Sequence, residues 1–250
     1  MTEQSYPRPG SVALVTGGGS GIGAAVAEAL VAVGCRVVCA GRHLDKLQAF
    51  TRRLGPKAHA LQLDVADPAS VDGMLDRLPQ ELREIEILVN NAGHDVGGRH
   101  RFDQGTMADW ASIIETNVLG LIRVTHKVIP GMIARDRGDI VNLGSVAGRR
   151  GYAGGTLYAG SKFAVHGFSD SLRLDCRNTG IRVIEIMPGM VRTDFAANRW
   201  KGDKAYATKY YDDYGVCLAP DDVARTILFA VQQPPHVVIA QLMVVPVSNT

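Results

Sequence analysis

The sequence predicts an α/β fold: a single doubly wound (Rossmann-like) seven-stranded parallel sheet with helices on both faces. Short apolar runs rich in valine and isoleucine alternate with longer segments of helical period, as buried parallel strands alternate with crossover helices. A glycine-rich turn follows the first run and leads directly into a helical segment. The 250 residues, 46% of them hydrophobic and 21% charged, suffice for one large domain with a sizeable core.

The expected strands are the short apolar runs. In chain order they are residues 12–16, 36–40, 58–63, 85–89, 139–143, 182–186 and 237–241. The expected helices are the segments of helical period between these runs. They cover about residues 21–33, 43–54, 68–82, 107–135, 156–178 and 220–232. Proline and acidic residues suit the first turn of a helix, so Asp67-Pro68 and Pro220-Asp221-Asp222 favour helix starts.

Residues 1–10 are interpreted as a mobile N-terminal tail and residues 11–250 as a single Rossmann-fold domain. The alternation breaks at about residues 191–217, a charged and tyrosine-rich segment between the sixth expected strand and the last expected helix. An inserted segment of this kind is more often functional than decorative.

The charge and apolar patterns exclude several classes of protein. The balance of 27 basic against 25 acidic residues gives a net charge of +2, too small for the basic face that nucleic-acid binding needs. No stretch approaches about 18 apolar residues and the start lacks a signal-peptide core, so we expect a cytoplasmic protein without a membrane partner. The four cysteines form no CxxC pair and have no histidine at ligand spacing, which favours buried thiols and predicts no metal site.

The turn after the first run reads Thr-Gly-Gly-Gly-Ser-Gly-Ile-Gly over residues 16–23. Such a turn lets the backbone approach a pyrophosphate, whose charge is held by the amides and dipole of the helix N-terminus. Its GxxxGxG spacing departs from the GxGxxG dinucleotide fingerprint, and a tight turn without a ligand is the alternative. The expected contacts are Gly17, Ser20, Gly21, Ile22 and Gly23.

The end of the second run bears on which dinucleotide binds. Sites for NAD carry an acidic residue about 20 positions after the glycines, where it binds the ribose 2′-hydroxyl. Here Arg42 lies 19 residues after Gly23, and an arginine suits a 2′-phosphate through its charge and forked donors. The sequence therefore favours NADP over NAD. The alternative is that Arg42 is a solvated charge and that Asp45 supplies the acid.

With these motifs the sequence resembles the short-chain dehydrogenase/reductase family, from about Val12 to the C-terminus. The motifs that carry the resemblance are TGGGSGIG at 16–23, Leu63-Asp64-Val65, NNAG at 90–93, Asn117, Ser145, YAGSK at 158–162, and Pro188-Gly189 with Thr193. Their order and spacing together are more specific than the short YxxxK pattern alone.

Hydride transfer to or from a carbon bearing oxygen requires acid–base chemistry, for which Tyr158 and Lys162 are the candidates. The ordinary pKa of a tyrosine is about 10, so a phenolate near neutral pH needs a neighbouring cation. Lys162 lies one helical turn later on the same face. The resemblance implies that Lys162 also binds the nicotinamide ribose, that Ser145 polarises the substrate oxygen and that Asn117 holds a water. Alternatively, Asn117 is a helix cap or bend residue, Ser145 ends a strand, and Tyr158 is a half-buried aromatic.

The resemblance also implies further cofactor contacts. They are Asp64 and Val65 at the adenine, Asn91, Ala92 and Gly93 at the adenosine ribose, and Pro188, Gly189, Val191 and Thr193 at the carboxamide and pyrophosphate. Asn90 is interpreted as a tie between strands.

A narrower resemblance is to NADP-dependent dehydrogenases of serine and other 3-hydroxy acids. It rests on residues 152–155, 188–191, 198–203 and 218–224 and implies an acidic or polar substrate. Arg199, Lys201 and Lys204 lie in the inserted segment, where a lid could place a cation against a carboxylate or sulfonate. The alternative is a solvated helix with Asp203 as an ion-pair partner.

Two loops depart from that branch and are expected at the mouth of the pocket. Residues 148–150 read Gly-Arg-Arg, and residues 94–101 are unusually cationic. Both favour a substrate larger or more strongly anionic than serine. His94 and His100 are interpreted as ordinary loop histidines.

The sequence thus predicts an oxidoreductase that uses NADP and acts on a small, anionic hydroxy or oxo compound. A broad-range carbonyl or 3-oxoacyl reductase is the alternative enzyme, and a non-catalytic nucleotide-sensing protein is the alternative of another class. The family implies a homo-oligomer, tetramer or dimer, paired through residues 107–135 and 156–178, whereas these segments could instead pack only on the sheet.

Overall fold

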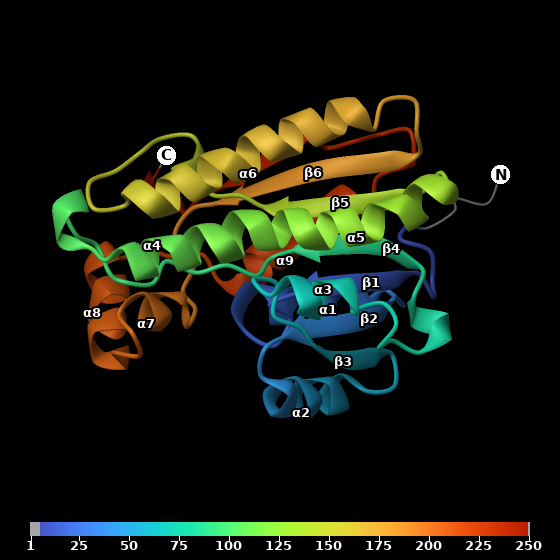
Figure 1. Cartoon of the computed structure of the whole chain (residues 1–250), viewed down its shortest axis with the longest axis horizontal. Helices are drawn as coiled ribbons and strands as arrows, with labels where there is room; N and C mark the ends of the chain where they lie inside the picture. The colour runs from blue at the N-terminus through green and yellow to red at the C-terminus, as the bar shows by residue number, and fades with distance from the viewer. Residues whose placement is uncertain (1–5, 250) are drawn as a thin grey trace.

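Parallel pairing joins seven strands into one sheet (Figure 1). The computed structural model describes residues 6–249. The strands are β1 (Val12–Thr16), β2 (Arg36–Gly41), β3 (Ala58–Gln62), β4 (Ile85–Asn90), β5 (Gly138–Leu143), β6 (Ile181–Pro188) and β7 (Gln241–Val244). Their order across the sheet is β3-β2-β1-β4-β5-β6-β7. All six neighbouring pairs are parallel, so the predicted fold class is confirmed.

Helices connect the strands. They are α1 (Gly21–Ala32), α2 (Leu44–Leu54), α3 (Pro68–Asp72), α4 (Met107–Ile114), α5 (Leu121–Ala134), α6 (Thr156–Asp175), α7 (Phe195–Arg199), α8 (Lys204–Tyr214) and α9 (Pro220–Val231). A π-helical segment, Glu115–Gly120, joins α4 to α5. Short 3-10 turns lie at Gln80–Leu82, Phe102–Gln104, Val146–Gly148 and Val247–Asn249.

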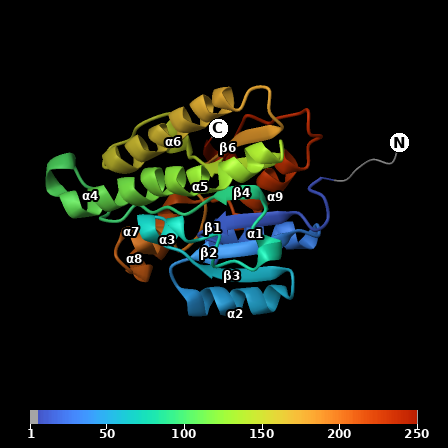
Figure 2. The ribbon, with the colours of Figure 1, turned by 45° about the vertical axis from the view of Figure 1, so that its right-hand side comes forward.

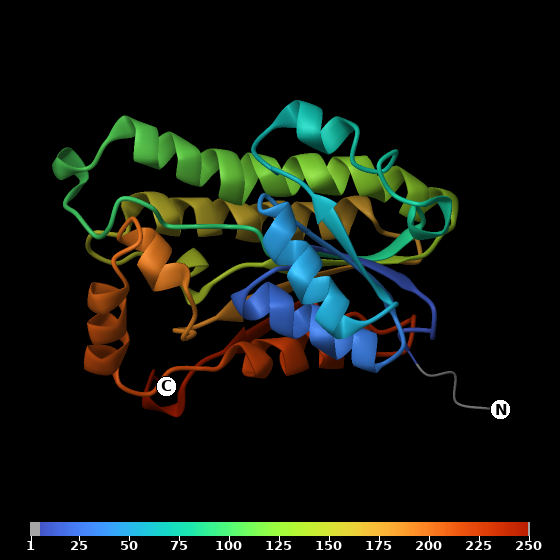
Figure 3. The same ribbon diagram turned by 90° about the horizontal axis from the view of Figure 1, so that it is seen from below.

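The sheet lies between two layers of helices (Figures 2 and 3). One apolar core packs α1, α2 and α9 on one face, and the other packs α3, α5 and α6 on the opposite face. Successive side chains of β1 point to opposite faces of the sheet. Ala13 and Val15 therefore belong to the first core, and Val12 and Leu14 belong to the second. A strand buried on both faces reads as a continuous apolar run, which is why the sequence signal was strong.

The chain reverses its direction of winding between β1 and β4. From β1 it proceeds outward to β2 and β3, then returns to the other side of β1 and proceeds through β4, β5, β6 and β7. At such a switch point the loops after neighbouring strands part and leave a crevice at the carboxyl ends of the strands. In Figure 1, α4, α7 and α8 lie at this end of the sheet.

The last strand lies later in the chain than predicted. Residues 237–241 were expected to form it, but β7 begins at Gln241, which pairs with Glu185. An arginine side chain binds several carbonyl groups of the preceding segment, whereas the Ala240 carbonyl accepts from the Glu185 amide of β6 (2.9 Å). The Arg182 guanidinium donates to the carbonyl oxygens of Gln233 (2.8 Å) and Val237 (3.1 Å). The apolar Val237 and Ile239 therefore belong to a loop, a contact that periodicity alone does not reveal.

The helix predicted at 68–82 is shorter, and α3 ends at Asp72. Side chains compete for the carbonyl groups that a longer helix would use. Arg77 donates to the carbonyl of Ser70 (2.7 Å), and Arg83 donates to those of Asp76 (3.0 Å) and Leu78 (2.9 Å). Pro79 has no N–H to donate within a helix, so the chain continues as turns and the 3-10 turn at Gln80–Leu82.

The ends of the chain and the inserted segment take definite positions. Of the predicted tail, residues 1–5 lie outside the described residues, whereas Pro7 is buried and Gly10 donates its N–H to Gly34 (2.9 Å). The segment 191–217 forms α7 and α8.

Among the described residues, no helix has the length and apolar character to span a membrane. All four cysteines are free thiols, three of them buried.

The Arg182→Met variant tests the role of this buried arginine. Arg182 is 7% exposed and also donates to both carboxylate oxygens of Asp139, at 2.6 and 2.8 Å. We expect the variant to lose about 3–5 kcal/mol of unfolding free energy, because Asp139 would stay buried without a counter-charge. Urea unfolding followed by circular dichroism measures the loss. Arg53→Met is the control: Arg53 pairs with Glu28 at the surface, and we expect its loss to stay below about 1 kcal/mol.

Candidate active site

A cavity of about 290 Å³ lies at the carboxyl ends of the strands. Its walls come from the loops after β1, β4, β5 and β6, from the start of α6 and from the inserted segment. Among the residues that line it are Ile22, Asn91, Gly93, Arg99, Ser145, Val146, Arg150, Tyr152, Tyr158, Lys162, Pro188, Gly189, Val191, Thr193, Phe195 and Arg199. Most of the cofactor, substrate and catalytic residues predicted from sequence therefore share one cavity.

The glycine-rich turn is shaped by close contacts that exclude side chains. A Cβ on Gly23 would lie 2.2 Å from the carbonyl oxygen of Gly17, and one on Gly17 would lie 2.8 Å from Nδ2 of Asn91. Gly17 also has a φ of +64°, which disfavours other residues. Beyond the turn, α1 begins without a side-chain cap from Ser20 and without an acidic residue in its first turn. Uncapped amides at a helix N-terminus fit an anionic group such as a pyrophosphate.

The end of β4 is fixed to this turn. The Asn91 side chain donates to the carbonyl oxygens of Thr16 (2.9 Å) and Gly17 (3.2 Å), while the Thr16 hydroxyl accepts from the Asn91 and Ala92 amides at 3.0 Å. Asn90 points the other way and donates to Thr125 (2.8 Å) and to Asn142 (2.9 Å). Both asparagines thus have structural ties, whatever they contact in a ligand.

Asn117 occupies the π-helical segment, where it binds the loop after β4 to α6. Its Nδ2 donates to the His94 carbonyl (2.9 Å) and to Oγ of Ser161 (3.1 Å), and its Oδ1 accepts from the His94 amide (2.9 Å). The Ser161 hydroxyl in turn donates to the carbonyl oxygen of Tyr158 (2.7 Å). Asn117 therefore positions the helical turn that carries Tyr158. The irregular turn of the helix is what brings its amide to this point.

Tyr158, Lys162 and Ser145 meet on one wall of the cavity. The Lys162 Nζ lies 5.7 Å from the centre of the Tyr158 ring and donates to the carbonyl oxygen of Leu143 (2.7 Å). Oγ of Ser145 accepts from the Ala147 amide (3.1 Å) and also forms a hydrogen bond with Tyr158. The Tyr158 ring packs edge-on against Phe195 of α7 at 5.7 Å. This arrangement can hold a substrate oxygen between two hydroxyl groups.

Burial acts on both titratable groups of this wall. It lowers the pKa of Lys162 to about 8, although the charges of Glu185 and Asp95 act in the opposite direction. Burial also raises the pKa of Tyr158, as do Tyr152 and Asp95, while the Ser145 hydrogen bond and the Arg199 charge lower it. The Lys162 ammonium donates to the Leu143 carbonyl in this structure, and its Nζ lies 5.7 Å from the centre of the Tyr158 ring.

Arg199 lies in the cavity wall, but its charge is already paired. It is 4% exposed, and its Nε donates to Oδ2 of Asp95 at 2.8 Å. Its guanidinium also lies 5.5 Å from the Phe195 ring and 5.3 Å from the Trp200 ring. The expected partner Asp203 instead caps α8 through the Tyr206 amide (2.9 Å). Burial raises the pKa of Asp95 to about 6 despite the Arg199 charge.

The structure does not bring Lys201 into the cavity. Its Nζ donates to Asp109 of α4 at 3.1 Å, and its side chain is 63% exposed. Lys204 is exposed at the start of α8. Of the three cations predicted in the inserted segment, Arg199 alone faces the cavity. A positive φ of +51° at Lys201 turns the chain away after α7.

Arg42 is exposed at the carboxyl end of β2, at the same edge of the sheet as the cavity. Burial lowers the pKa of His94 in the loop after β4, and the Arg42 charge adds to the effect. Asp45 is exposed in the first turn of α2. Asp64 folds back on its own loop and accepts from the Ala66 amide (3.0 Å), while Val65 is buried. Arg42 is therefore free to meet a phosphate at this edge.

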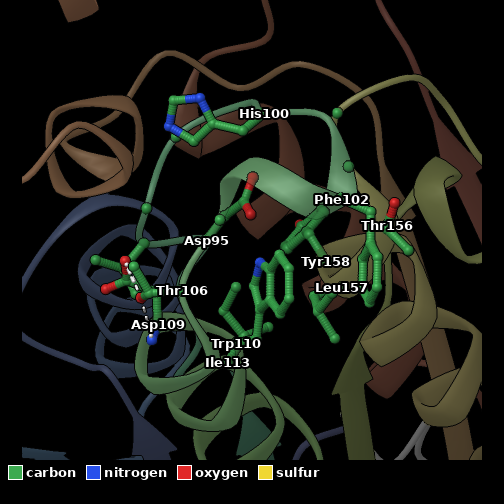
Figure 4. Close-up of a pocket in the computed structure, with 16 residues that line it drawn as sticks. Asp95, His100, Phe102, Thr106, Asp109, Trp110, Ile113, Thr156, Leu157 and Tyr158 are labelled. Carbon is green, nitrogen blue, oxygen red and sulfur yellow. Dashed lines mark hydrogen bonds between the residues drawn. The ribbon is translucent and has the colours of Figure 1, made fainter.

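A second hollow adjoins Tyr158 on the side of α4 (Figure 4). Phe102 and Trp110 stack at 4.5 Å between ring centres and form its apolar wall, and Asp95 and Tyr158 border it as well. Thr106 and Asp109 also line this hollow, and the Thr106 hydroxyl donates to Asp109 (2.9 Å). Asp95 borders the second hollow and binds Arg199 of the first cavity.

Several residues at or behind the site could not be found from a sequence motif. Asp95, Phe195 and Glu185 carried no motif. Tyr152 was noted only within a branch motif, yet it lines the cavity and burial raises its pKa to about 12. Asp95, Tyr152 and Phe195 share a position in the segments that follow strands at the active edge, whereas Glu185 lies inside β6. Among the described residues, no group of three or more histidine, cysteine or acidic side chains could hold a metal ion.

The chain is similar to known dehydrogenases over most of its length. The model of the short chain dehydrogenase family matches residues 11–204. The chain is 39% identical over 240 residues to the NADP-dependent 3-hydroxy acid dehydrogenase of Escherichia coli (strain K12), covering 96% of each. It is 37% identical to the NADP-dependent 3-hydroxy acid dehydrogenase of Schizosaccharomyces pombe, covering 95% of this chain and 93% of that one.

Solved structures are similar as well. The closed form of a serine dehydrogenase complexed with NADP+ superposes with a TM-score of 0.93 at 39% identity, covering 96% of each chain. An actinorhodin polyketide ketoreductase with NADPH gives a TM-score of 0.84 at 30% identity, covering 94% of this chain and 96% of that one.

The Lys162→Met variant tests the cost of burying the ammonium group. The pKa of Lys162 is about 8 in the folded chain, below the value of an exposed lysine, so folding favours the neutral form. We expect the variant to be more stable at pH 7 by up to about 3 kcal/mol. Its advantage should shrink as the pH rises from 8 to 10.5, because the unfolded wild-type chain then binds more protons than the folded one.

Denaturant unfolding at pH 7, 9 and 10 measures this difference. Lys209→Met is the control, since Lys209 is 70% exposed and we expect no change from it. A Lys162→Met variant less stable than the wild type at pH 7 would contradict the analysis.

Proposed function

The chain belongs to the short chain dehydrogenase family and is an oxidoreductase of that family, and we propose that it transfers a hydride between NADP(H) and a 3-hydroxy acid or a similar small anionic hydroxy or oxo compound. The observation that carries the proposal is the cavity in which Ser145, Tyr158 and Lys162 lie beside a cationic wall. The relatives named for NADP-dependent oxidation of 3-hydroxy acids support it.

The glycine-rich turn and the neighbouring loops would hold the cofactor. We assign the pyrophosphate to the α1 N-terminus, through Gly17, Ser20, Gly21, Ile22 and Gly23. The adenine side is assigned to Asp64, Val65, Asn91, Ala92 and Gly93, and the nicotinamide side to Lys162, Pro188, Gly189, Val191 and Thr193. Arg42 would pair with the 2′-phosphate, which favours NADP over NAD. When bound, the cofactor supplies the nicotinamide carbon that accepts or releases the hydride.

The residues of the chain supply the proton transfer. Tyr158 takes the hydroxyl proton of the substrate during oxidation and returns it during reduction. Ser145 donates a hydrogen bond to the same oxygen and orients it. Lys162 stabilises the phenolate, which requires its Nζ to turn from Leu143 toward Tyr158. Asn117 supports proton exchange with solvent through the loop and helix that it holds together.

Substrate recognition is assigned to Arg199 together with Ser145 and Tyr158. Arg199 keeps guanidinium N–H groups beyond the one donated to Asp95, and they can bind a carboxylate at the cavity wall. Lys201, paired with Asp109 outside the cavity, has no part in this assignment. The segment 191–217, with α7 and α8, acts as a lid that contributes Phe195 and Arg199.

A second candidate is a carbonyl or 3-oxoacyl reductase of broad range. The aromatic wall of Tyr152 and Phe195 favours it, because such side chains tolerate larger apolar substrates. A nucleotide-sensing protein without turnover is disfavoured, since a sensor does not need Ser145, Tyr158 and Lys162 in one cavity.

We also propose a cytoplasmic homo-oligomer, a dimer or tetramer. Exposed apolar side chains on α5 and α6 support it, namely Ile133 (53% exposed), Phe163 (45%) and Leu174 (54%). In a two-fold symmetric oligomer, the α5 and α6 faces of two subunits would pack together and cover these side chains.

The Tyr158→Phe variant tests the acid–base assignment. We expect turnover to fall at least about 1,000-fold, because no other hydroxyl at the site replaces the phenol as proton carrier. Absorbance at 340 nm with NADP and a panel of 3-hydroxy acids measures turnover, and fluorescence titration measures cofactor affinity, which should stay close to that of the wild type. Retained turnover would refute the assignment.

The Arg42→Asp variant tests the cofactor assignment. It removes the partner of the 2′-phosphate and adds a like charge, so we expect the affinity for NADP to fall about 100-fold or more while that for NAD changes little. Arg36→Asp, at the opposite end of β2, is the matched control and should leave both affinities unchanged. An equal loss for the two cofactors in Arg42→Asp would contradict the 2′-phosphate contact.

A further inference from the structure

The cavity has an uneven balance of charge. Four cationic side chains line it: Arg99, Arg150, Lys162 and Arg199. None of the described residues that line it is acidic. The four cations come from different elements, so their convergence is a property of the fold and is not visible in any one motif.

Two of these cations have carboxylates behind them. Arg199 forms its buried ion pair with Asp95 at 2.8 Å. The charges of Glu185, which is fully buried, and of Asp95 raise the pKa of Lys162 against the effect of burial. These two cations are therefore largely balanced by the protein itself.

The other two make no ion pair with any described residue, although the charge of Arg99 also acts on Asp95 and lowers its pKa. Both Arg99 and Arg150 are exposed. The Arg99 guanidinium is instead held between aromatic rings, 4.7 Å from the centre of Tyr152 and 5.1 Å from that of Tyr210. Stacking of this kind fixes the plane of a guanidinium while leaving its N–H groups available in that plane.

Arg149, the neighbour of Arg150 in the same loop, is bound by other side chains outside the cavity. Its Nε lies 3.4 Å from the sulfur of Met187, and its terminal nitrogen donates to the side chain of Gln241. Arg149 does not line the cavity. Of two successive arginines, one is bound to the sheet and the other is left at the mouth of the cavity.

We propose that Arg99 and Arg150 bind a second anionic group of the substrate, at the end remote from the reacting carbon. The inference rests on the proposed function and narrows its substrate class to hydroxy acids that carry two anionic groups. Arg199 binds the first carboxylate beside Ser145 and Tyr158, and the two unpaired arginines bind a carboxylate, sulfonate or phosphate at the cavity mouth.

The reaction itself is unchanged by this assignment. During oxidation the carbinol loses a hydride from its carbon to NADP+ and a proton from its oxygen to Tyr158. The C–H and O–H bonds break as the C=O bond forms. The second anion takes no part in bond making. It adds binding energy away from the reacting carbon, which can orient the carbinol against Ser145 and Tyr158.

The test compares substrates that differ by one charge. The kcat/KM of the wild-type enzyme with NADP is measured for 3-hydroxypentanedioate and for its monoamide, in which a neutral amide of similar size replaces one carboxylate. We expect the dianion to be preferred at least about 30-fold, and the preference to fall about tenfold in Arg150→Gln and in Arg99→Gln. The matched control is Arg149→Gln, for which the preference should equal that of the wild type.

Two further arms identify the second anion and exclude a cofactor role. The terminal carboxylate is replaced by a sulfonate and by a phosphate, and the order of the three kcat/KM values identifies the second anion. The KM for NADP should stay within about twofold in Arg99→Gln and Arg150→Gln, and a rise of tenfold or more would make them cofactor contacts and overturn the proposal.

The outcomes separate this inference from the proposed function. Equal kcat/KM for the dianion and the monoamide would overturn the second anion site and leave oxidation of hydroxy acids in place. Absence of NADP-dependent turnover with every hydroxy acid, while neutral ketones are reduced, would overturn the proposed function.

Discussion

The contact between the glycine-rich turn and the end of β4 is the constraint on which the site depends. Asn91 reaches across the switch point to the carbonyl groups of Thr16 and Gly17, and a side chain on Gly17 or Gly23 would occupy the space that this contact needs. The turn therefore has its shape before any ligand binds. A preformed turn places the amides of α1 and the loops after β4, β5 and β6 around one cavity, so the binding of an anion costs little reorganisation.

The second constraint is electrostatic. A lysine in the wall of a buried site loses hydration, which favours its neutral form, yet its proposed role requires the charge. Glu185 opposes this loss from behind, and it is packed so closely that a Cβ on Gly144 would lie 2.4 Å from its Oε1. His166 binds the other oxygen of Glu185 at 2.7 Å and lies 3.5 Å from the more exposed Asp170. Glu185 is thus connected through His166 of α6 to the more exposed Asp170.

Much of the fold and of the reacting wall could be predicted from the sequence, because both depend on local patterns. Buried parallel strands have an apolar signature of their own, and Tyr158 and Lys162 share a helix turn whose geometry is fixed by their spacing. The predictions are wrong or incomplete where a side chain far away in the sequence determines the local structure. Arg182 binds the Val237 carbonyl of the predicted last strand, Arg77 and Arg83 bind carbonyl groups of the helix predicted at 68–82, and Asp95 binds Arg199 from 104 positions away. No local pattern encodes such pairings.

The pairing of Asp95 with Arg199 determines how the proposed lid can move. The two side chains are each 5% exposed, and separating them inside the site would leave two buried charges unpaired, at a cost of about 3–5 kcal/mol. The backbone adds a second tie, since the Gly97 amide donates to the Arg199 carbonyl at 3.1 Å. Because both ties join α7 to the loop after β4, an opening of the proposed lid would carry this loop with it. The glycines at 97, 98 and 202, all with positive φ, lie beside the ties and can absorb the rotation. Arg99 belongs to the same loop, so the anion proposed to bind there would also stabilise the closed lid, and recognition of the remote end of the substrate would be coupled to closure over the reacting end.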